Sequence, residues 1–411
     1  EPATPVFVGR APELAALAEA FAEVRAGQAR ALSVHGPSGL GKTTLVRHFL
    51  TGLAAEALVL EGRCYDRESV PHKALDALID DLARKVARLP PERRAALVQP
   101  ELQRMFPVLG PATVPGGPAV DPHGARRRAA QALGQLLVAV ADGRPLVLWI
   151  DDLHWGDGDS AALLAELLAR PGLPLLLLAS HRPGLPATWA TLPWRRLDLA
   201  PLEPAQAHAL AEQLAPEAEH GVTARIVAEA AGNPLFIAEL VRHGAPAASL
   251  EQALQARYQG LPDGARRLLG AVAVAGRPLA QALLGEVAGG GAGELALSRL
   301  RAERWVEVRG QDVDAVHDRV REAVLGALQA GEVTAWHRRL AGALEAAGGG
   351  HPEHLLEHWR RAGEPVRAQA HALLAAERAM AALAFEHAAR LLALATTLAP
   401  LAPGRAAATH A

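Results

Sequence analysis

Apolar residues in the first half of the chain recur with two periods, which distinguish helices from strands. Residues 11–25 place apolar side chains three or four positions apart, which predicts a helix with one buried face. Other apolar runs are short enough to be buried strands. The predicted strands are 31–35, 56–61, 146–152, 174–180 and 195–199, and the predicted helices between them are 43–50, 70–89, 125–141 and 163–168. Strands that alternate with helices predict an α/β domain with a parallel sheet. Residues 105–124, rich in proline and glycine, predict a loop.

Beyond residue 200 the pattern becomes mainly helical. Residues 203–243 predict a small all-helical lid. Helices predicted at 250–258, 263–273 and 294–302 precede a hairpin pattern at 305–308 and 313–316, an order that suggests a winged helix. Residues 334–398 are alanine-rich and helical, and 368–378 with 381–398 resemble one tetratricopeptide-like hairpin.

Composition indicates a folded chain of several domains. The 411 residues are too many for one ordinary core, and half of them are hydrophobic. A net charge of -2 gives no electrostatic sign of nucleic-acid binding. The one cysteine, Cys64, excludes an internal disulfide and a zinc site built from cysteines. No apolar run is long enough to span a membrane and no signal peptide is evident, so we expect a cytoplasmic location and no membrane partner.

Two residue types are rare enough to draw attention to the positions where they occur. Arginine is abundant, but lysine occurs only at Lys42, Lys73 and Lys85, and asparagine only at Asn233. We interpret this bias as the codon preference of a GC-rich genome. A lysine or asparagine that persists against the bias is a stronger candidate for a specific role.

A complete phosphate-binding motif follows the first predicted strand. The pattern G-x-x-x-x-G-K-[ST] needs a strand before it and a helix after it, and both are predicted here. Glycines let backbone N–H groups curl around phosphates, a lysine reaches the β- and γ-phosphates, and a threonine hydroxyl can ligate Mg²⁺. We therefore expect ATP or ADP with Mg²⁺ to bind at Gly36, Pro37, Ser38, Gly39, Leu40, Gly41, Lys42, Thr43 and Thr44.

Two later strands end in residues that suit the same chemistry. The run from residue 146 ends in Asp151 and Asp152, and the carboxyl end of a parallel strand faces the ligand crevice. Asp151 is the candidate to hold Mg²⁺ directly or through water, and Asp152 is the candidate to orient or deprotonate the attacking water. Arg182 follows the strand at 174–180 and could stabilise charge on the γ-phosphate, although a solvated surface arginine is the alternative.

These residues together resemble the STAND class, the signal-transduction ATPases with numerous domains that are related to AAA+ proteins. The resemblance extends from about residue 6 to 330 and rests on the order of five motifs. They are Val6-Phe7-Val8-Gly9-Arg10, the phosphate loop, Asp151-Asp152-Leu153-His154-Trp155-Gly156-Asp157, Arg182, and Gly232-Asn233-Pro234. With the helical pattern beyond it, we expect an α/β P-loop domain at 1–199, a lid at 200–247, a winged-helix-like domain at 248–330 and a tetratricopeptide-like region at 331–411.

The resemblance also implies roles that spacing alone does not. Val8, Gly9 and Arg10 would lie beside the adenine and ribose, and Pro234 would press on the base. His317 would sense the ADP phosphate, with a histidine at a helix start capped by Asp318 as an equal alternative. The function implied is a slow regulatory switch ATPase. Its rivals are the ATPase core of a transcription regulator whose DNA-binding domain lies elsewhere, a non-hydrolysing scaffold, and an AAA+ ring motor.

A narrower resemblance concerns residues 61–76, which are similar to ATPase modules fused to bacterial serine/threonine kinases. The first residue is Glu1 rather than methionine, so we expect a piece of a longer protein, with a fused kinase or effector domain or a separate protein partner. We expect oligomerisation on activation and no direct nucleic-acid binding. His351, His354 and His358 have the spacing of metal ligands, but without partner ligands we interpret them as a polar helix face.

Overall fold

The computed structural model describes residues 6–65, 70–110, 122–217, 220–243, 249–289, 293–348 and 351–399. The chain divides into two compact units. The first comprises Glu1–Cys64, Val70–Ala238 and Glu377–Ala388, and the second comprises Tyr65–Ser69, Glu239–Ala376 and Ala389–Ala411. The division into four domains therefore stays a prediction. In the described residues, no helix is long and apolar enough to cross a membrane.

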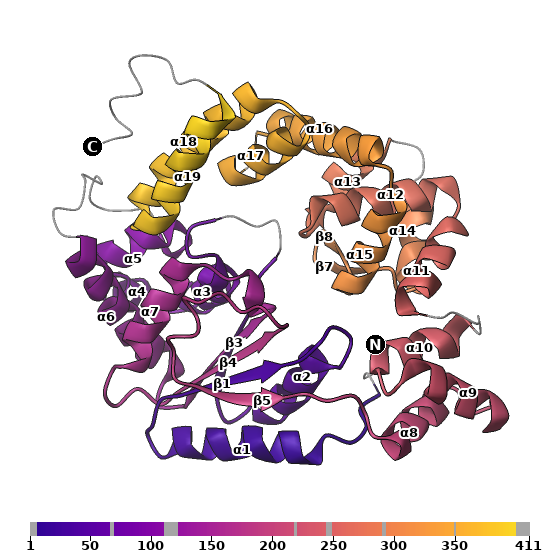
Figure 1. The fold of residues 1–411 in the computed structure, drawn as a ribbon. Coiled ribbons are helices and arrows are strands. Elements are labelled where there is room, and N and C mark those ends of the chain that lie inside the picture. Colours follow the sequence, from indigo (N-terminus) through magenta and orange to yellow (C-terminus); the bar gives the residue numbers. More distant parts are fainter. Residues whose placement is uncertain are drawn as a thin grey trace. The chain divides into compact units, whose positions relative to one another are not determined.

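A five-stranded parallel sheet forms the centre of the first unit (Figure 1). Its strands are β1 (Arg30–His35), β2 (Leu58–Arg63), β3 (Leu146–Asp151), β4 (Leu175–His181) and β5 (Trp194–Asp198). Their order is β2-β3-β4-β1-β5, and every neighbouring pair is parallel. Because all five strands run the same way, their carboxyl ends lie at one edge of the sheet. β3 and β4 are buried along their whole length, as their unbroken apolar runs require.

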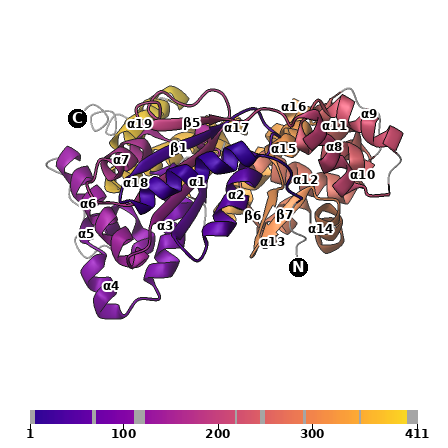
Figure 2. The ribbon, with the colours of Figure 1, turned by 90° about the horizontal axis from the view of Figure 1, so that it is seen from below.

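Helices cover both faces of this sheet (Figure 2). They are α1 (Ala11–Arg25), α2 (Lys42–Leu53), α3 (Lys73–Val86), α4 (Pro91–Leu97), α5 (Pro100–Met105), α6 (Pro122–Ala141) and α7 (Gly158–Leu168), with 3₁₀ turns at Pro107–Leu109 and Leu153–Trp155. Apolar residues of α1 and α2 share one core with Val147 and Leu178 of the sheet. Those of α3, α5, α6 and α7 share another with Leu148 and Leu177. Two cores, one on each face, complete a three-layer α/β domain.

The predicted alternation of strands and helices is confirmed in this unit, with one local error. Residues 105–124 were predicted as a loop, but Met105 ends α5, Pro107–Leu109 forms a 3₁₀ turn and Gly124 lies within α6. The middle of that segment, 111–121, lies outside the described residues. The short helices α4 and α5 both begin at a proline, Pro91 and Pro100. Proline suits the first turn of a helix, so these two prolines mark helix starts.

Three helices follow the sheet: α8 (Pro204–Leu214), α9 (His220–Ala230) and α10 (Pro234–His243). They correspond to the predicted helical lid. The first half of α10 belongs to the first unit, and its second half, from Glu239, belongs to the second. This helix is therefore a continuous element through which the two units are joined.

The second unit begins with a helical cluster and a small antiparallel sheet (Figure 1). Its elements are α11 (Leu250–Gln259), α12 (Asp263–Ala275), β6 (Leu279–Ala280), α13 (Gln281–Ala288), α14 (Gly293–Ala302), β7 (Val306–Arg309), β8 (Asp312–Ala315) and α15 (Asp318–Ala327). The strands pair in the order β6-β8-β7. The hairpin at β7 and β8 confirms the predicted hairpin, whereas β6 and α13 were not predicted; the winged-helix assignment stays a prediction. The core centres on α12, which is buried from Leu268 to Ala275.

Four further helices complete the described chain: α16 (Ala330–Ala346), α17 (Pro352–Arg361), α18 (Pro365–Ala381) and α19 (Phe385–Leu398). The predicted antiparallel pair near the end of the chain corresponds to α18 and α19. The turn between them lies in the first unit, where Leu383 joins the core beside α3 and Asp159 accepts a hydrogen bond of 3.2 Å from the His387 N–H.

Two of the three histidines that were predicted to form a polar helix face lie on α17, and that face is buried rather than exposed. His354 and His358 are only 6% and 2% exposed. The His358 Nδ1 lies 2.8 Å from Nδ1 of His337, which is itself fully buried on α16, and Nε2 of His354 lies 3.3 Å from the Arg277 guanidinium. Glu353 is fully buried on the same helix. The histidines belong to a buried polar cluster, because α17 packs this face against α16.

Candidate functional site

The carboxyl ends of β1, β3 and β4 bring together a threonine, an aspartate and a serine. The Thr43 hydroxyl donates to Oδ2 of Asp151 at 2.8 Å, and the Ser180 hydroxyl donates to Oδ1 at 2.5 Å. Trp149 in turn donates its indole N–H to the Ser180 hydroxyl at 3.2 Å. Asp151 is 4% exposed, so these donors compensate for burial of its carboxylate. The pair predicted to hold Mg²⁺, Thr43 and Asp151, is thus in direct contact.

The phosphate loop follows β1 and opens into α2, as the motif requires. Lys42 is the first residue of α2 and is 7% exposed. Its ammonium donates to the carbonyl oxygens of Gly36 and Pro37, both at 2.8 Å. The lysine therefore lies over its own loop, with its charge at the N-terminal end of α2. In that position lysine and helix dipole both favour an anion.

The start of α10 lies on the backbone of this loop. Asn233 donates from its side-chain amide to the Ser38 carbonyl at 3.4 Å, and the Leu235 N–H donates to the Gly39 carbonyl at 3.3 Å. The Asn233 side-chain oxygen also caps α10 by accepting from the N–H groups of Leu235 and Phe236. Gly39 has φ of +87°, and a Cβ there would come within 2.8 Å of the Asn233 amide. Only glycine permits both this loop conformation and the contact.

Arg10 approaches the loop from the other side. It is 6% exposed, and its guanidinium donates to the Ala200 carbonyl at 2.8 Å and the Leu40 carbonyl at 3.3 Å, besides pairing with Glu13. Arg10 is the residue before α1 and has the left-handed conformation, with φ of +65°. Gly9 also has positive φ, and a Cβ there would overlap the side chain of Gln206 on α8. The Val8-Gly9-Arg10 segment thus connects α1, the phosphate loop and α8.

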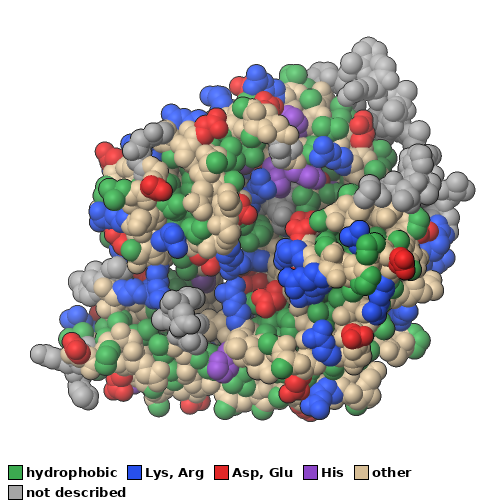
Figure 3. Space-filling view, turned by 180° about the vertical axis from the view of Figure 1, so that it is seen from behind, with side chains coloured by type: hydrophobic (Ala, Val, Ile, Leu, Met, Phe, Trp, Pro, Cys, Tyr) green, Lys and Arg blue, Asp and Glu red, His purple; other side chains and the backbone are tan. Residues whose placement is uncertain are grey.

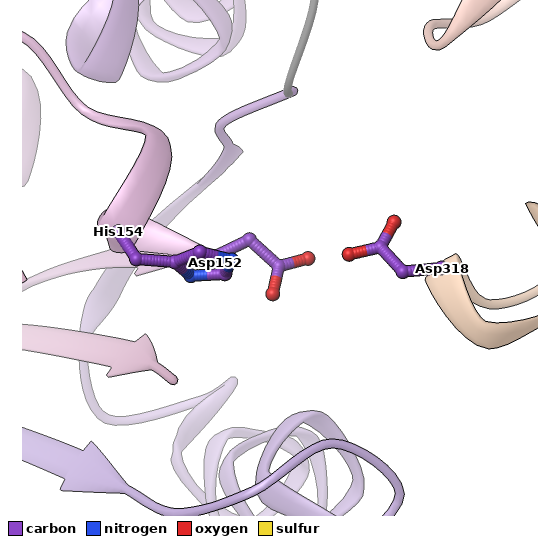
Figure 4. Close-up of side chains that lie close together, drawn as sticks. All are labelled: Asp152, His154 and Asp318. Carbon is purple, nitrogen blue, oxygen red and sulfur yellow. The ribbon is translucent and has the colours of Figure 1, made fainter. Parts of the chain in front are cut away.

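Asp152 lies one residue beyond β3, in the left-handed conformation with φ of +55°. Figure 4 shows its carboxylate extending from the loop that also carries His154. Arg63, at the end of β2, forms an ion pair with it at 3.0 Å. Asp151 and Asp152 are adjacent, but the first faces the threonine of the phosphate loop and the second faces an arginine. The two carboxylates therefore have different surroundings, as different chemical roles require.

The end of β4 contributes a buried histidine beside the predicted arginine. Burial is the largest influence on His181 and lowers its pKa, and the nearby His35, Arg196 and Lys42 lower it further, whereas a hydrogen bond with the Arg182 carbonyl raises it. His181 is therefore held neutral near the phosphate loop. Arg182 follows directly, and its N–H lies 3.5 Å from Nδ1 of His154. The arginine is thus at the predicted edge of the sheet.

Pro234 and His317, the last two predicted nucleotide contacts, both lie at the start of a helix. Pro234 is the first residue of α10, next to Asn233, so it begins the helix that contacts the loop. His317 lies in the second unit, where its Nδ1 accepts from the Arg319 N–H at 3.1 Å and caps α15. The alternative in which Asp318 is the cap is wrong, because Asp318, also labelled in Figure 4, is already inside the first turn. The sensing role of His317 stays a prediction.

Sequence reasoning missed Ser180 and Arg63. Both stand at the carboxyl ends of strands that neighbour β3, and Asp151 and Asp152 depend on them for hydrogen bonds. Polar residues at the ends of parallel strands meet at one edge of the sheet, and this position is the signal that could have identified them. To find their partners, the order of the strands across the sheet must also be known.

The residues of the loop fit a phosphate chain. The Ser38 hydroxyl is buried and makes no hydrogen bond to the atoms that the structure describes. The Lys42 ammonium donates to two neutral carbonyl oxygens of the same loop. A buried donor of this kind and a buried cation both gain from a phosphate oxygen. The Thr43–Asp151 pair offers the oxygen ligands that Mg²⁺ prefers.

Comparison with known families supports this assignment for the first part of the chain. Residues 6–178 match the family described as AAA ATPase domain. An uncharacterised protein of Rhizobium meliloti (strain 1021) is 27% identical over 323 residues, which are 68% of this chain and 31% of that protein. The chain thus spans about a third of the length of that relative.

A solved structure extends the likeness to almost the whole chain. It is a signal-transduction ATPase with numerous domains, carrying a tetratricopeptide repeat sensor, from Pyrococcus horikoshii. The match has a TM-score of 0.65 at 16% identity and covers 96% of this chain and 54% of the other. At that identity the likeness concerns the fold. With the match to the AAA ATPase domain, it supports the family resemblance: residues 6–178 match an AAA-type P-loop domain, and the fold of the chain is similar to that of this STAND protein.

Proposed function

We propose that this chain is a regulatory switch ATPase, which binds ATP or ADP with Mg²⁺ and couples the bound nucleotide to domain rearrangement in signalling. The proposal rests above all on α10. This helix begins with hydrogen bonds to the Ser38 and Gly39 carbonyls of the phosphate loop, and its second half belongs to the other unit. A change at the phosphates therefore has a direct covalent route into the second unit.

The far half of α10 is firmly attached to the second unit. Glu239 is 6% exposed and pairs with Arg242 at 3.0 Å and with Arg257 of α11. Arg257 also donates to the Glu303 carbonyl at 3.1 Å, and its guanidinium lies 4.2 Å from the centre of the Trp305 ring. A buried, networked ion pair resists separation of its partners. We infer that movement of α10 carries α11 with it.

The roles follow from the surroundings of each group. Lys42 and the loop N–H groups would hold the phosphates, and Thr43 and Asp151 would hold Mg²⁺, which supplies positive charge beside them. Asp152 would orient the attacking water, and Arg182 would contact the γ-phosphate. Arg10 with Val8 and Gly9 would border the nucleoside, and Pro234 would cover the base. His317 would contact the ADP phosphate.

A switch needs a difference between the two nucleotides. ATP has a γ-phosphate that Arg182 can contact and ADP does not, so the two ligands stabilise different arrangements of α10 to the extent that those contacts differ. We infer that the output is carried by a protein partner or a fused kinase or effector domain, and that activation includes oligomerisation.

The test begins with the purified protein. It is denatured, and the released nucleotide is identified by ion-exchange chromatography, with Lys42→Ala as the matched variant. We expect near-stoichiometric ADP from the parent and none from the variant. Full retention of nucleotide by Lys42→Ala would defeat the assignment of the loop. An empty parent that also fails to bind added ATP would favour a scaffold without nucleotide chemistry.

A second experiment addresses coupling rather than binding. Asn233→Ala removes the side-chain bond to the Ser38 carbonyl and the cap of α10, while the phosphate loop is retained. We expect the ratio of ADP to ATP affinity to shift toward unity, and limited proteolysis of the two nucleotide states to become alike. Asn233→Asp, which keeps the cap oxygen but loses the amide donor, separates capping from the loop contact. An unchanged affinity ratio in both variants would remove α10 from the switch.

A further inference from the structure

An open groove lies at the edge of the sheet formed by β2, away from the carboxyl ends of the strands that form the nucleotide site. It has a volume of about 750 Å³ and is lined by residues of α2, of β2, and of the ends of α3 and α6. The helix layers that cover the two faces of the sheet form its walls. β2 is the terminal strand of the sheet, so the groove runs beside main chain that has only one neighbouring strand.

Among the charged side chains that line this groove, cations outnumber acids by four to one. Arg47 comes from α2, Lys85 from α3, Arg88 from just beyond α3, and Arg144 from just beyond α6, whereas Glu61 is the acid among the lining residues. Lys85 has a distant carboxylate partner, Asp81 at 3.7 Å. Elsewhere on the molecule ion pairs such as Arg25–Glu56 and Arg195–Glu19 are common, and Figure 3 shows cationic and acidic side chains interspersed on one face.

Three of these cations have no carboxylate partner in the described parts of the chain. Arg47 lies over the Trp149 ring at 5.7 Å, and Arg144 donates to the Ala141 carbonyl at 3.2 Å, but neither forms an ion pair there, and nor does Arg88. Three unpaired arginines and a weakly paired lysine around one groove repel one another, and an anion would relieve that repulsion. Lys85 is also one of the three lysines that persist in an arginine-rich chain.

The edge strand contributes main-chain hydrogen-bonding groups. The Leu58 N–H donates to the Pro145 carbonyl at 2.9 Å, so the main-chain groups of Leu58 face β3. Main-chain groups alternate in direction along a strand, so the N–H and C=O of Val59 face the open side, and Val59 lines the groove. Apolar side chains, including Leu50, Leu58 and Val140, form the rest of the lining.

We propose that this groove binds an extended acidic peptide segment of a partner protein, which adds to the sheet beside β2. Open edge strands bind peptides in this way, with main-chain bonds for affinity and flanking side chains for specificity. The cations come from three separate parts of the chain around the groove, an origin that suits a partner with several carboxylates. The proposal does not depend on the nucleotide switch.

The probe is a short fluorescent peptide in which glutamate alternates with threonine, and its binding to the full chain is followed by fluorescence polarisation. We expect binding that weakens as salt is added, and none for the same peptide with lysine in place of glutamate. Lys85→Gln with Arg88→Gln should weaken binding about tenfold, since each exposed charge pair contributes modestly. Arg93→Gln with Arg94→Gln, on the exposed helix α4, is the matched control and should leave the affinity unchanged.

Two N-methylated peptides test the main-chain pairing without changing the protein. Methyl groups on alternate amides block edge pairing in one register and spare it in the other, so one peptide should bind several-fold more weakly than its counterpart. Equal affinity of the two, with displacement by inorganic pyrophosphate, would identify a small-anion site and overturn the peptide proposal. Equal losses in the groove and control variants would also overturn it, because binding would then follow net charge alone.

Discussion

Two buried polar regions of this protein are built on opposite principles. At the carboxyl ends of β1 to β4, Asp151, Lys42 and the Ser38 hydroxyl are buried beside a loop shaped for a ligand. In the helical unit, His337 of α16 and His358 of α17 are just as deeply buried, yet their Nδ1 atoms lie 2.8 Å apart. In the first region the polar groups are placed where a ligand can bind. In the second region the polar groups join two helices.

This difference predicts which measured quantity a substitution in each region should change. A residue kept for a ligand contributes little to folding, because its best partner is absent until the ligand binds. A buried polar pair that is satisfied internally contributes to folding, since removal of one partner leaves the other without a hydrogen bond. Ligand affinity or turnover should therefore report on the first region, and the free energy of unfolding on the second.

The largest expected effect is on turnover at the strand ends. Asp152→Asn removes a carboxylate that could accept a proton, while Asn keeps an oxygen that can accept from Arg63. We expect the single-turnover hydrolysis rate to fall about a hundredfold or more, with nucleotide affinity and thermal stability nearly unchanged. Rapid-quench measurement of ATP cleavage checks this. An unchanged rate would remove Asp152 from catalysis.

The next effect is on stability in the helical unit, and it depends on pH. Burial raises the pKa of Tyr258, which is 3% exposed, to about 12 from its ordinary value of 10.0. The unfolded chain therefore loses this proton at a pH where the folded chain keeps it. Folding loses stability as pH rises from 10 toward 12, by about 2 kcal/mol. Urea unfolding followed through tryptophan fluorescence measures the loss.

Tyr258→Phe provides the control for that pH dependence, because phenylalanine keeps the ring and does not titrate. The variant loses the hydroxyl that donates to the Arg266 carbonyl at 3.4 Å, which is a long and weak bond. We expect its stability to decline less over the same pH interval. A parallel decline in parent and variant would assign the pH dependence to other groups.

A smaller effect on stability tests the histidine pair directly. His358→Leu leaves the His337 ring nitrogen without the partner it has at 2.8 Å, and we expect a loss between about 1 and 2 kcal/mol in the free energy of unfolding. His337→Leu with His358→Leu should cost less than the sum of the single changes, because the orphaned ring is then also removed. Strict additivity in urea unfolding would show that the pair does not act as a unit.

The same contrast explains how much could be predicted from the sequence. The phosphate loop was predicted because its residues are contiguous and its strand and helix lie on either side, so local order carries the three-dimensional arrangement. Asp151 and Asp152 were found because a strand end is visible in the sequence. The contact between His337 and His358 could not be predicted, because it depends on the packing of two helices, and spacing along either helix does not reveal it.

Ser180 and Arg63 lie between these two cases. Each stands at the end of a strand, but its hydrogen-bond partner is at the end of the neighbouring strand β3. The sequence predicts a strand that ends at Ser180 and another that ends two residues before Arg63, but not that β2 and β4 flank β3. The apolar pattern also did not predict α4 and α5, because these helices are short and bury few residues. Inference from sequence therefore succeeded where neighbours in the chain are neighbours in space, and failed where sheet order or helix packing determines the contact.

The smallest expected effect returns to the strand ends and sharpens the comparison. Ser180→Ala removes one of the two hydroxyls that donate to Asp151, so the carboxylate is less well held for Mg²⁺. One such bond is worth about 1 kcal/mol, and we expect roughly fivefold weaker binding of Mg²⁺-nucleotide. Titration with fluorescent ADP should detect the change when Mg²⁺ is present and none in its absence. If the loss instead appears as lower stability with normal Mg²⁺ dependence, Ser180 serves the core through Trp149, and this part of the strand end resembles the helical cluster after all.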